Sequence, residues 1–188
     1  MRKVVASAFI SLDGVAERPD TFLTNFDEEM DEFGGRVIAT QDAVFLGRRT
    51  YDEWAEFWPQ SDIEPFATFI NSVKKFVVTS SKLGAIWTNT TVVGNEPLEF
   101  LAALKQESGG DIGIHGSITL TQSFIASGAV DELRLIVAPA LQGRGRRLFP
   151  ESIPRQLELI SGVTSPTGSL LLDYYVTQES PGSFRPSS

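Results

Sequence analysis

Residues 111–141 read DIGIHGSITLTQSFIASGAVDELRLIVAPAL and contain a complete strand–helix–strand pattern. The apolar start predicts a short strand, residues 118–126 predict a helix, and ELRLIVAPAL predicts a longer buried strand. His115, the only histidine of the chain, and Gly116 stand where the first strand gives way to the helix. A helix between two buried strands is typical of a parallel sheet, so this stretch predicts an α/β fold.

The remainder of the chain continues this alternation of strands and helices. The segment QLELISGVTSPTGSLLLDYYVTQ predicts two further strands that meet in a hairpin at SPTGS. We therefore expect one domain over 1–178, with a mostly parallel sheet, helices on both faces and an antiparallel C-terminal hairpin, followed by a flexible tail at 179–188. Apolar runs predict strands at 3–10, 43–47, 76–79 and TTVVG, and apolar spacing or breaker residues predict helices at 26–38 (capped by Asn25 or Asp27), 48–59 and 98–107.

Composition excludes several classes of protein. The 188 residues carry a formal net charge of -8, which disfavours nucleic acid and anionic membrane surfaces as partners. The absence of cysteine excludes disulfides and thiolate chemistry, and with a single histidine we expect no metal site. No apolar run approaches the ~20 residues of a membrane span, and we expect a cytoplasmic protein.

Three predicted strand ends carry polar, glycine-containing or basic segments: FLGRRTYDEW, VVTSSKLG and GIHGSITL. In a parallel sheet such ends lie at one edge, where ligands bind. Free N–H groups at a helix start attract phosphate, and glycine lets the backbone approach a ligand. Each segment taken alone is equally consistent with an ordinary helix cap, because Ser and Thr are favoured there. Three together, two with cationic residues, favour a phosphate-rich ligand.

The same segments resemble a known family. FLGRRTYDEW resembles the Gly-Arg-x-Thr segment of dihydrofolate reductases. The stretch GIHGSITLTQSFIASGAVDELRLIVAPALQGRGRRLF closely resembles the C-terminal reductase domain of the bifunctional deaminase-reductase of riboflavin biosynthesis, and ASAFISLDGVAE resembles that domain's first strand and turn. The resemblance covers about residues 3–176 and implies a dihydrofolate-reductase-like three-layer fold, a homodimer, and a reductase that uses NADPH on a small heterocyclic substrate.

The resemblance also implies where the cofactor binds. GRRT would meet the pyrophosphate, TSSK would surround the adenosine 2′-phosphate, HGSI would hold the pyrophosphate or the nicotinamide ribose, and the first strand and turn would flank the nicotinamide. The segment TSSK is expected to start a helix, and a phosphate with ~2 negative charges favours the hydroxyl donors and the cation that TSSK offers there. The implied cofactor residues are Ala8, Asp13, Gly14, Val15, Gly47, Arg48, Arg49, Thr50, Thr79, Ser80, Ser81, Lys82, His115, Gly116, Ser117 and Ile118.

Hydride transfer also needs a proton source. Dihydrofolate reductases place a carboxylate on the first helix, and here Asp27 and Asp31 lie at the margin of its predicted apolar face. They are the candidate catalytic residues, although acids at a helix start also stabilise the helix dipole. His115, which titrates near neutral pH in water, is a further neighbour of the cofactor.

The substrate half of the pattern is weaker than the cofactor half. The riboflavin reductase domains carry a basic residue after the first turn and an acid before the glycine pair, and the positions matched here are Val15 and Ile114, both apolar. Two alternatives therefore stay open: a nucleotide-binding module without catalysis, and a flavin-binding or other phosphate-ligand protein on the same fold.

Overall fold

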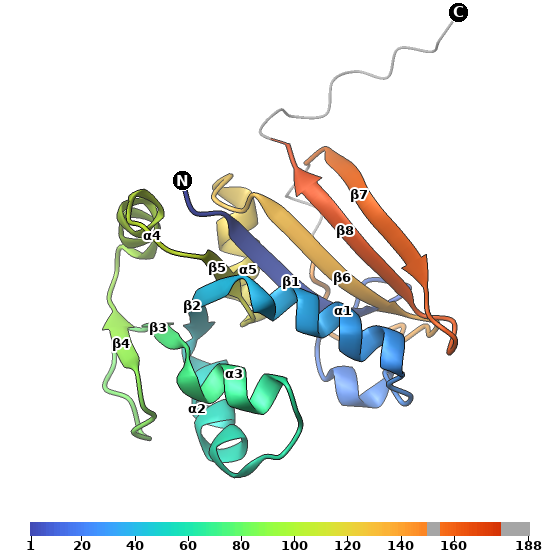
Figure 1. The fold of residues 1–188 in the computed structure, drawn as a ribbon, viewed down its shortest axis with the longest axis horizontal. Helices are drawn as coiled ribbons and strands as arrows, with labels where there is room; N and C mark the ends of the chain where they lie inside the picture. Colours follow the sequence, from blue (N-terminus) through green and yellow to red (C-terminus); the bar gives the residue numbers. More distant parts are fainter. Residues whose placement is uncertain (150–154, 178–188) are drawn as a thin grey trace, which may run out of the picture.

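An eight-stranded sheet runs through the centre of the described part of the molecule, in the order β4-β3-β2-β5-β1-β6-β8-β7 (Figure 1). The computed structural model describes residues 1–149 and 155–177, so the predicted tail at 179–188 lies outside the described residues. In this spatial order, the six strands β4, β3, β2, β5, β1 and β6 are parallel to their neighbours. Strand β8 runs antiparallel to β6 and to β7. The strands are β1 (Val4–Ser11), β2 (Gln41–Gly47), β3 (Lys74–Val78), β4 (Thr90–Val93), β5 (Asp111–Ile114), β6 (Glu132–Ala138), β7 (Leu157–Thr164) and β8 (Leu170–Val176).

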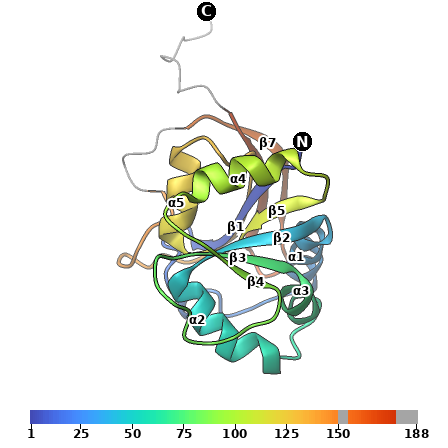
Figure 2. The same ribbon diagram turned by 90° about the vertical axis from the view of Figure 1, so that its left-hand side faces the viewer.

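Helices cover both faces of this sheet, as the alternation of elements predicts (Figure 2). Two of them, α4 and α5, pack on one face, and the other three pack on the opposite face. Short 3-10 turns, Pro19–Thr21 and Trp58–Gln60, precede α1 and follow α2. The helices are α1 (Glu28–Ala39), α2 (Arg48–Phe57), α3 (Phe66–Ser72), α4 (Pro97–Gln106) and α5 (Ile118–Ala126).

The inner parallel strands β2, β3 and β5 read as apolar runs because they are buried on both faces of the sheet. Towards α4 and α5, Phe45 and Ile114 pack against Phe124. Towards the other three helices, Leu46 packs in a cluster with Ile70 of α3. Consecutive strand residues thus contribute to two separate cores, and polar side chains are left for the strand ends.

The structure differs from the sequence prediction in two places. The segment after β3 starts no helix: it continues as an irregular loop to β4, so Lys82 does not stand at a helix start. Helix α3 was not predicted, because its seven residues are too few to show a helical period and Pro65 directly precedes them. The helix at 118–126 is confirmed with the same bounds, and Asp27 is confirmed as the cap of the first helix.

Strand β7 forms one edge of the sheet and lies open to solvent (Figure 1). Every residue from 158 to 164 is exposed, including Leu159, Ile160 and Val163. An exposed edge strand with apolar side chains is uncommon in a monomer, because its free backbone groups can pair with another strand.

Candidate functional site

The carboxyl ends of β2 and β5 touch through two glycines. The Gly47 N–H donates to the Gly116 carbonyl at 3.0 Å. A Cβ on Gly47 would lie 2.4 Å from the Ser117 hydroxyl, and Gly116 has a φ of +133° with Thr50 beside it. Larger residues do not fit at either position. The starts of α2 and α5, with their free N–H groups, therefore lie side by side, as the sequence predicts for a phosphate site.

Arg48, the first residue of α2, reaches across to the loop that follows β3. Its Nε donates to Asp52 at 2.6 Å, and its Nη1 donates to the Ser81 hydroxyl at 2.8 Å and to the Lys82 carbonyl at 2.6 Å. The neighbouring Arg49 is exposed and makes no hydrogen bond or ion pair within the described residues. Of the two arginines, Arg49 is therefore the one available to a ligand.

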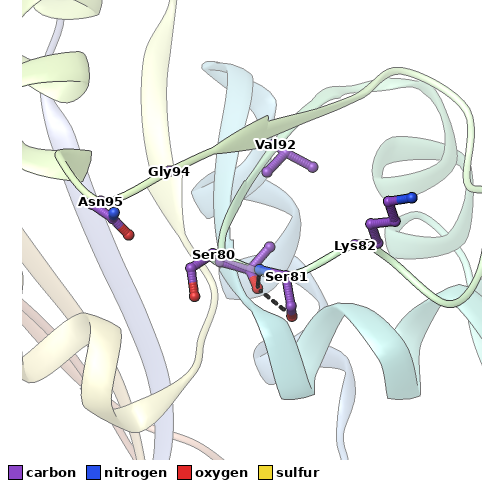
Figure 3. A pocket seen from close by; sticks show the side chains of 7 residues that line it. Ser80, Ser81, Lys82, Val92, Gly94 and Asn95 are labelled. Carbon is purple, nitrogen blue, oxygen red and sulfur yellow. Dashed lines mark hydrogen bonds between the residues drawn. The ribbon is translucent and has the colours of Figure 1, made fainter.

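The loop after β3 borders an open cleft of about 420 Å³ (Figure 3). Its wall carries three hydroxyl groups and one ammonium group on adjacent residues, and the Thr79 and Ser81 hydroxyls lie 3.1 Å apart. The Lys82 ammonium has no partner in the described ranges. This combination of short donors and a free cation suits a phosphate monoester. The cleft is lined by Thr79, Ser80, Ser81, Lys82, Val92, Gly94 and Asn95.

The far end of the same loop is fastened to α2. The Tyr51 hydroxyl donates to the Ala85 carbonyl at 3.0 Å and accepts from the Trp87 N–H at 3.1 Å. Tyr51 is fully buried, so these bonds form away from water. Helix α2 therefore holds the loop at both ends, through Arg48 and Tyr51.

The turn after β1 is held by the carboxylate of Asp13. This group accepts from the Ser11 hydroxyl at 2.6 Å and from the N–H groups of Gln142 and Gly143 at 3.0 and 2.8 Å. These hydrogen bonds, that from Ser11 first, lower the pKa of Asp13 to about 2. Asp13 thus anchors the segment after β6 onto the turn.

The neighbours of Asp13 in the turn have separate surroundings. Gly14 has a φ of +84°, and Val15 is buried and pairs with Arg147 in an isolated bridge. Ala8 packs against the core beneath α4 and α5. Arg146 donates to the Thr119 hydroxyl at 2.6 Å, which ties the same segment to the start of α5. The turn and the two helix starts thus belong to one connected edge of the sheet.

His115 is enclosed between the strands β1 and β2. Its Nε2 lies 2.7 Å from Gln41 Oε1, and its Nδ1 lies 3.2 Å from the Ser7 hydroxyl. The rings of Phe66 and Phe69 from α3 cover it at 5.6 and 6.0 Å between centroids. Burial lowers the pKa of His115 to about 4, so the imidazole is neutral and joins three strands.

Ile114 and His115 face opposite sides of the sheet. Ile114, which the sequence match placed at the polar position before the glycine, is fully buried in the core beneath α5. Strand residues alternate between faces, so His115 is the residue that faces α3.

Asp27 caps helix α1 and joins it to the β7–β8 turn. Its carboxylate accepts from the Met30 N–H at 3.1 Å and from the Thr167 N–H and hydroxyl at 3.1 and 2.7 Å. Desolvation raises the pKa of Asp27, but the bonds from Thr167 and Met30 outweigh it and hold the pKa below its usual value. Asp31 is exposed on the first turn of the helix. The two candidate acids therefore have different surroundings, since only Asp27 is engaged.

A second cavity of about 470 Å³ lies beside this cap. It is formed by the segment before α1, the end of β6 and the β7–β8 turn, and it carries no charged side chain. Its residues are Thr21, Phe22, Leu23, Thr24, Asn25, Ala138, Pro139, Ala140, Leu141, Gln142, Thr167 and Ser169.

The sequence analysis did not identify the residues that hold Arg48, His115 and the loop after β3 in place. The pairing of Arg48 with Asp52 follows the i, i+4 spacing of a helix and was readable from the sequence. Gln41 and Tyr51 gave no signal, because their partners stand 74 and 34 or 36 positions away.

Solved structures with the same arrangement define the class of fold. A putative riboflavin biosynthesis protein from Shewanella sp. PV-4 has a TM-score of 0.72 at 20% identity, covering 94% of this chain and 99% of that chain. Dihydrofolate reductase from Enterococcus faecalis, complexed with NADP(H), has a TM-score of 0.59 at 17% identity, covering 93% and 94%. The chain therefore has a dihydrofolate-reductase-like fold.

The family follows from the sequence match. The RibD C-terminal domain family matches residues 2–171, and the chain belongs to this family. YwjB of Bacillus subtilis (strain 168), described as an uncharacterized protein, is 31% identical over 153 residues, which is 80% of this chain and 84% of that protein. Family and fold together support a reductase-like role. Within 1–149 and 155–177, no helix combines the length and the apolar character needed to cross a membrane.

Proposed function

We propose that the protein is an NADPH-dependent reductase that transfers hydride to a small heterocycle of the aminouracil or dihydropteridine type. One observation carries the proposal: the paired helix starts at Gly47 and Gly116 adjoin, through Arg48, a cleft lined with hydroxyls and a free lysine. A dinucleotide with a pyrophosphate and a separate phosphate monoester needs two anion sites of this kind.

The residues of this edge fit that cofactor. The absence of side chains at Gly47 and Gly116 lets the starts of α2 and α5 lie against each other, so a pyrophosphate could meet the N–H groups of both first turns, with Arg49 and Thr50 beside them. The hydroxyls of Ser80 and Ser81 and the Lys82 ammonium would hold the 2′-phosphate. When bound, NADPH supplies the hydride, and the protein orients it and excludes water.

The other residues proposed for the cofactor site lie in the first turn and at the start of α5, and several of them hold the backbone of the site in place. Asp13 fixes the turn beside the proposed nicotinamide site, with Gly14 and Val15 completing that turn. Ser117 caps α5 through its hydroxyl, which accepts from the Leu120 N–H at 3.4 Å. Ile118 then starts the helix, and its N–H group is one of those left for the cofactor.

Asp27 and Asp31 stay the predicted candidates for the residue that supplies the proton. At neutral pH Asp27 is ionised and accepts three hydrogen bonds, so its contribution would be to hold a protonated substrate or a water molecule. Asp31, exposed and free of such contacts within the described residues, is the comparison residue.

NADPH oxidation against a panel of aminouracils and dihydropterins tests the proposal. Turnover of one class, with a slower rate for NADH, supports it. Tight NADPH binding with no turnover on any substrate supports the second candidate, a nucleotide-binding module without catalysis, which the buried Val15 and the fully engaged Asp27 favour. A thermal shift from flavin nucleotide and none from NADPH would contradict both.

We also propose that the protein is a homodimer that pairs through β7. No strand of the described residues pairs with the outer side of β7, which exposes Leu159, Ile160 and Val163. A second copy related by a two-fold axis would extend the sheet and cover these side chains.

A further inference from the structure

Arg48 lies between a carboxylate on its own helix and the loop that forms the phosphate cleft. Its Nε is held by Asp52, four residues later, and its Nη1 group donates to the Ser81 hydroxyl and the Lys82 carbonyl. The guanidinium is planar, so fixing Nε on one side aims Nη1 on the other. Asp52 therefore determines where Arg48 points.

The contacts continue from Arg48 into the cleft. The Ser81 hydroxyl lies 3.1 Å from the Thr79 hydroxyl, and the Ser81 N–H donates to the same Thr79 oxygen at 3.2 Å (Figure 3). Because Arg48 donates to the Ser81 oxygen, the Ser81 hydrogen is left to bond Thr79 or a ligand. A chain of polar contacts thus joins Asp52 to the wall of the cleft.

We propose that Asp52 and Arg48 are positioning residues that set the shape of this cleft and, through it, the preference for a ligand with a phosphate monoester on the nucleoside. The inference rests on the proposed function. Arg48 pairs with Asp52 through Nε and donates to the loop through Nη1, so it acts on the cleft through the loop. Lys82, whose ammonium is free, meets the phosphate itself.

Two further observations agree with a positioning role. The second carboxylate oxygen of Asp52 is buried and has no hydrogen-bond partner among the described residues, although 41% of the side-chain surface is exposed. A buried oxygen without a hydrogen bond costs free energy, so the contact with Arg48 is what favours this orientation of the carboxylate. The far end of the loop is fastened by Tyr51, so Arg48 is the residue of α2 that fixes the end beside the cleft.

The first experiment needs no ligand. Hydrogen exchange of the amides at 79–84 is compared between the unsubstituted protein, Asp52→Asn and Glu53→Gln. Glu53 is the matched control, because it is the next residue on the same helix, is exposed and has no partner among the described residues. We expect D52N to speed exchange there by about three- to tenfold, since a partly exposed charged hydrogen bond is lost, and E53Q to change nothing. Equal exchange in D52N and the unsubstituted protein would overturn the inference.

The second experiment measures the ratio of the Kd values for NADH and NADPH by calorimetry. D52N should lower this ratio by about three- to tenfold, while its unfolding temperature stays close to that of the unsubstituted protein. D52E should restore most of the ratio. Lys82→Met should remove the preference for NADPH, so that the two Kd values become equal. A purely structural role for Asp52 would weaken both cofactors equally and leave the ratio unchanged, which also contradicts the inference. If the unsubstituted protein binds neither cofactor, the proposed function fails and the exchange result alone decides whether Asp52 positions the loop.

Discussion

At the scale of single residues, the site depends on positions where nothing larger than hydrogen fits. Gly47 is enclosed by Ser117, and Gly116 combines a left-handed backbone with the nearby Thr50. Their spacing to the basic and hydroxyl residues was visible in the sequence. The reason for each glycine was not, because it lies in a neighbour from another part of the chain.

Gly47→Ala should weaken NADPH binding and lower the free energy of unfolding by about 1–3 kcal/mol, because the new methyl group would overlap the Ser117 hydroxyl. Urea unfolding and calorimetric titration with NADPH measure the two effects. Gly34→Ala, on a helix with no atom within 4 Å of the added carbon, is the control and should stabilise by about 0.5–1 kcal/mol. Unchanged stability and affinity in G47A would refute the close approach of β2 and β5.

His115 should make stability depend on pH in a window where few other groups titrate. The pKa of His115 is about 4 in the folded protein, against 6.5 for a histidine side chain in water. Between these values the unfolded chain binds a proton that the folded chain does not, so stability is complete above pH 6.5 and falls as pH drops towards 4, by up to about 3 kcal/mol. Urea unfolding at several pH values should show this slope, and His115→Gln should flatten it. A slope that persists in H115Q would assign it to other groups.

At the scale of elements, periodicity located the long helices and most strands well. The helix at 118–126 needed no change, because a serine cap and a glycine stop enclose a clear apolar pattern. The loop after β3 was misread as a helix start, since TSSK has cap chemistry and its true partners, Arg48 and Tyr51, come from α2. Local sequence identifies a cap-like segment but does not decide which element uses it.

Helix α1 provides a test of both stability and catalysis. Asp27→Ala should lower the free energy of unfolding by about 1–2 kcal/mol, through loss of the cap and of the bonds to Thr167. Asp31→Asn should leave stability within about 0.5 kcal/mol, because Asp31 is exposed. Steady-state rates with NADPH then separate the roles. A fall in kcat for D31N alone would assign the proton donor to Asp31. A fall in kcat for Asp27→Asn, measured where that variant is still folded, would assign the proton donor to Asp27.

At the scale of the whole molecule, the fold was predictable from its alternation of elements and its terminal hairpin. The strand order was not, because β5 enters between β2 and β1 and no local pattern encodes that insertion. This insertion brings the GRRT and HGS segments together. The substrate side could not be predicted, since it depends on how α1, α3 and the turns pack.

Replacing Leu159 and Val163 by lysine should convert the proposed dimer into a monomer. Both side chains are exposed on the outer strand, so the change removes apolar contact and adds repulsion without touching the core. Sedimentation velocity over a range of concentrations measures the mass, and the far-ultraviolet spectrum checks that the fold is kept. A monomeric unsubstituted protein would refute pairing through β7.

The enclosure of His115 between Ser7 and Gln41 also provides a spectroscopic probe. The chain has one histidine, so its proton NMR spectrum contains a single set of imidazole signals that needs no assignment by mutation. A ring N–H bonded to Gln41 and partly covered by Phe66 and Phe69 should exchange slowly with water and give a resonance far downfield. Its position and lifetime would report, in the intact protein, whether the centre of the sheet changes when a ligand binds at the edge beside it.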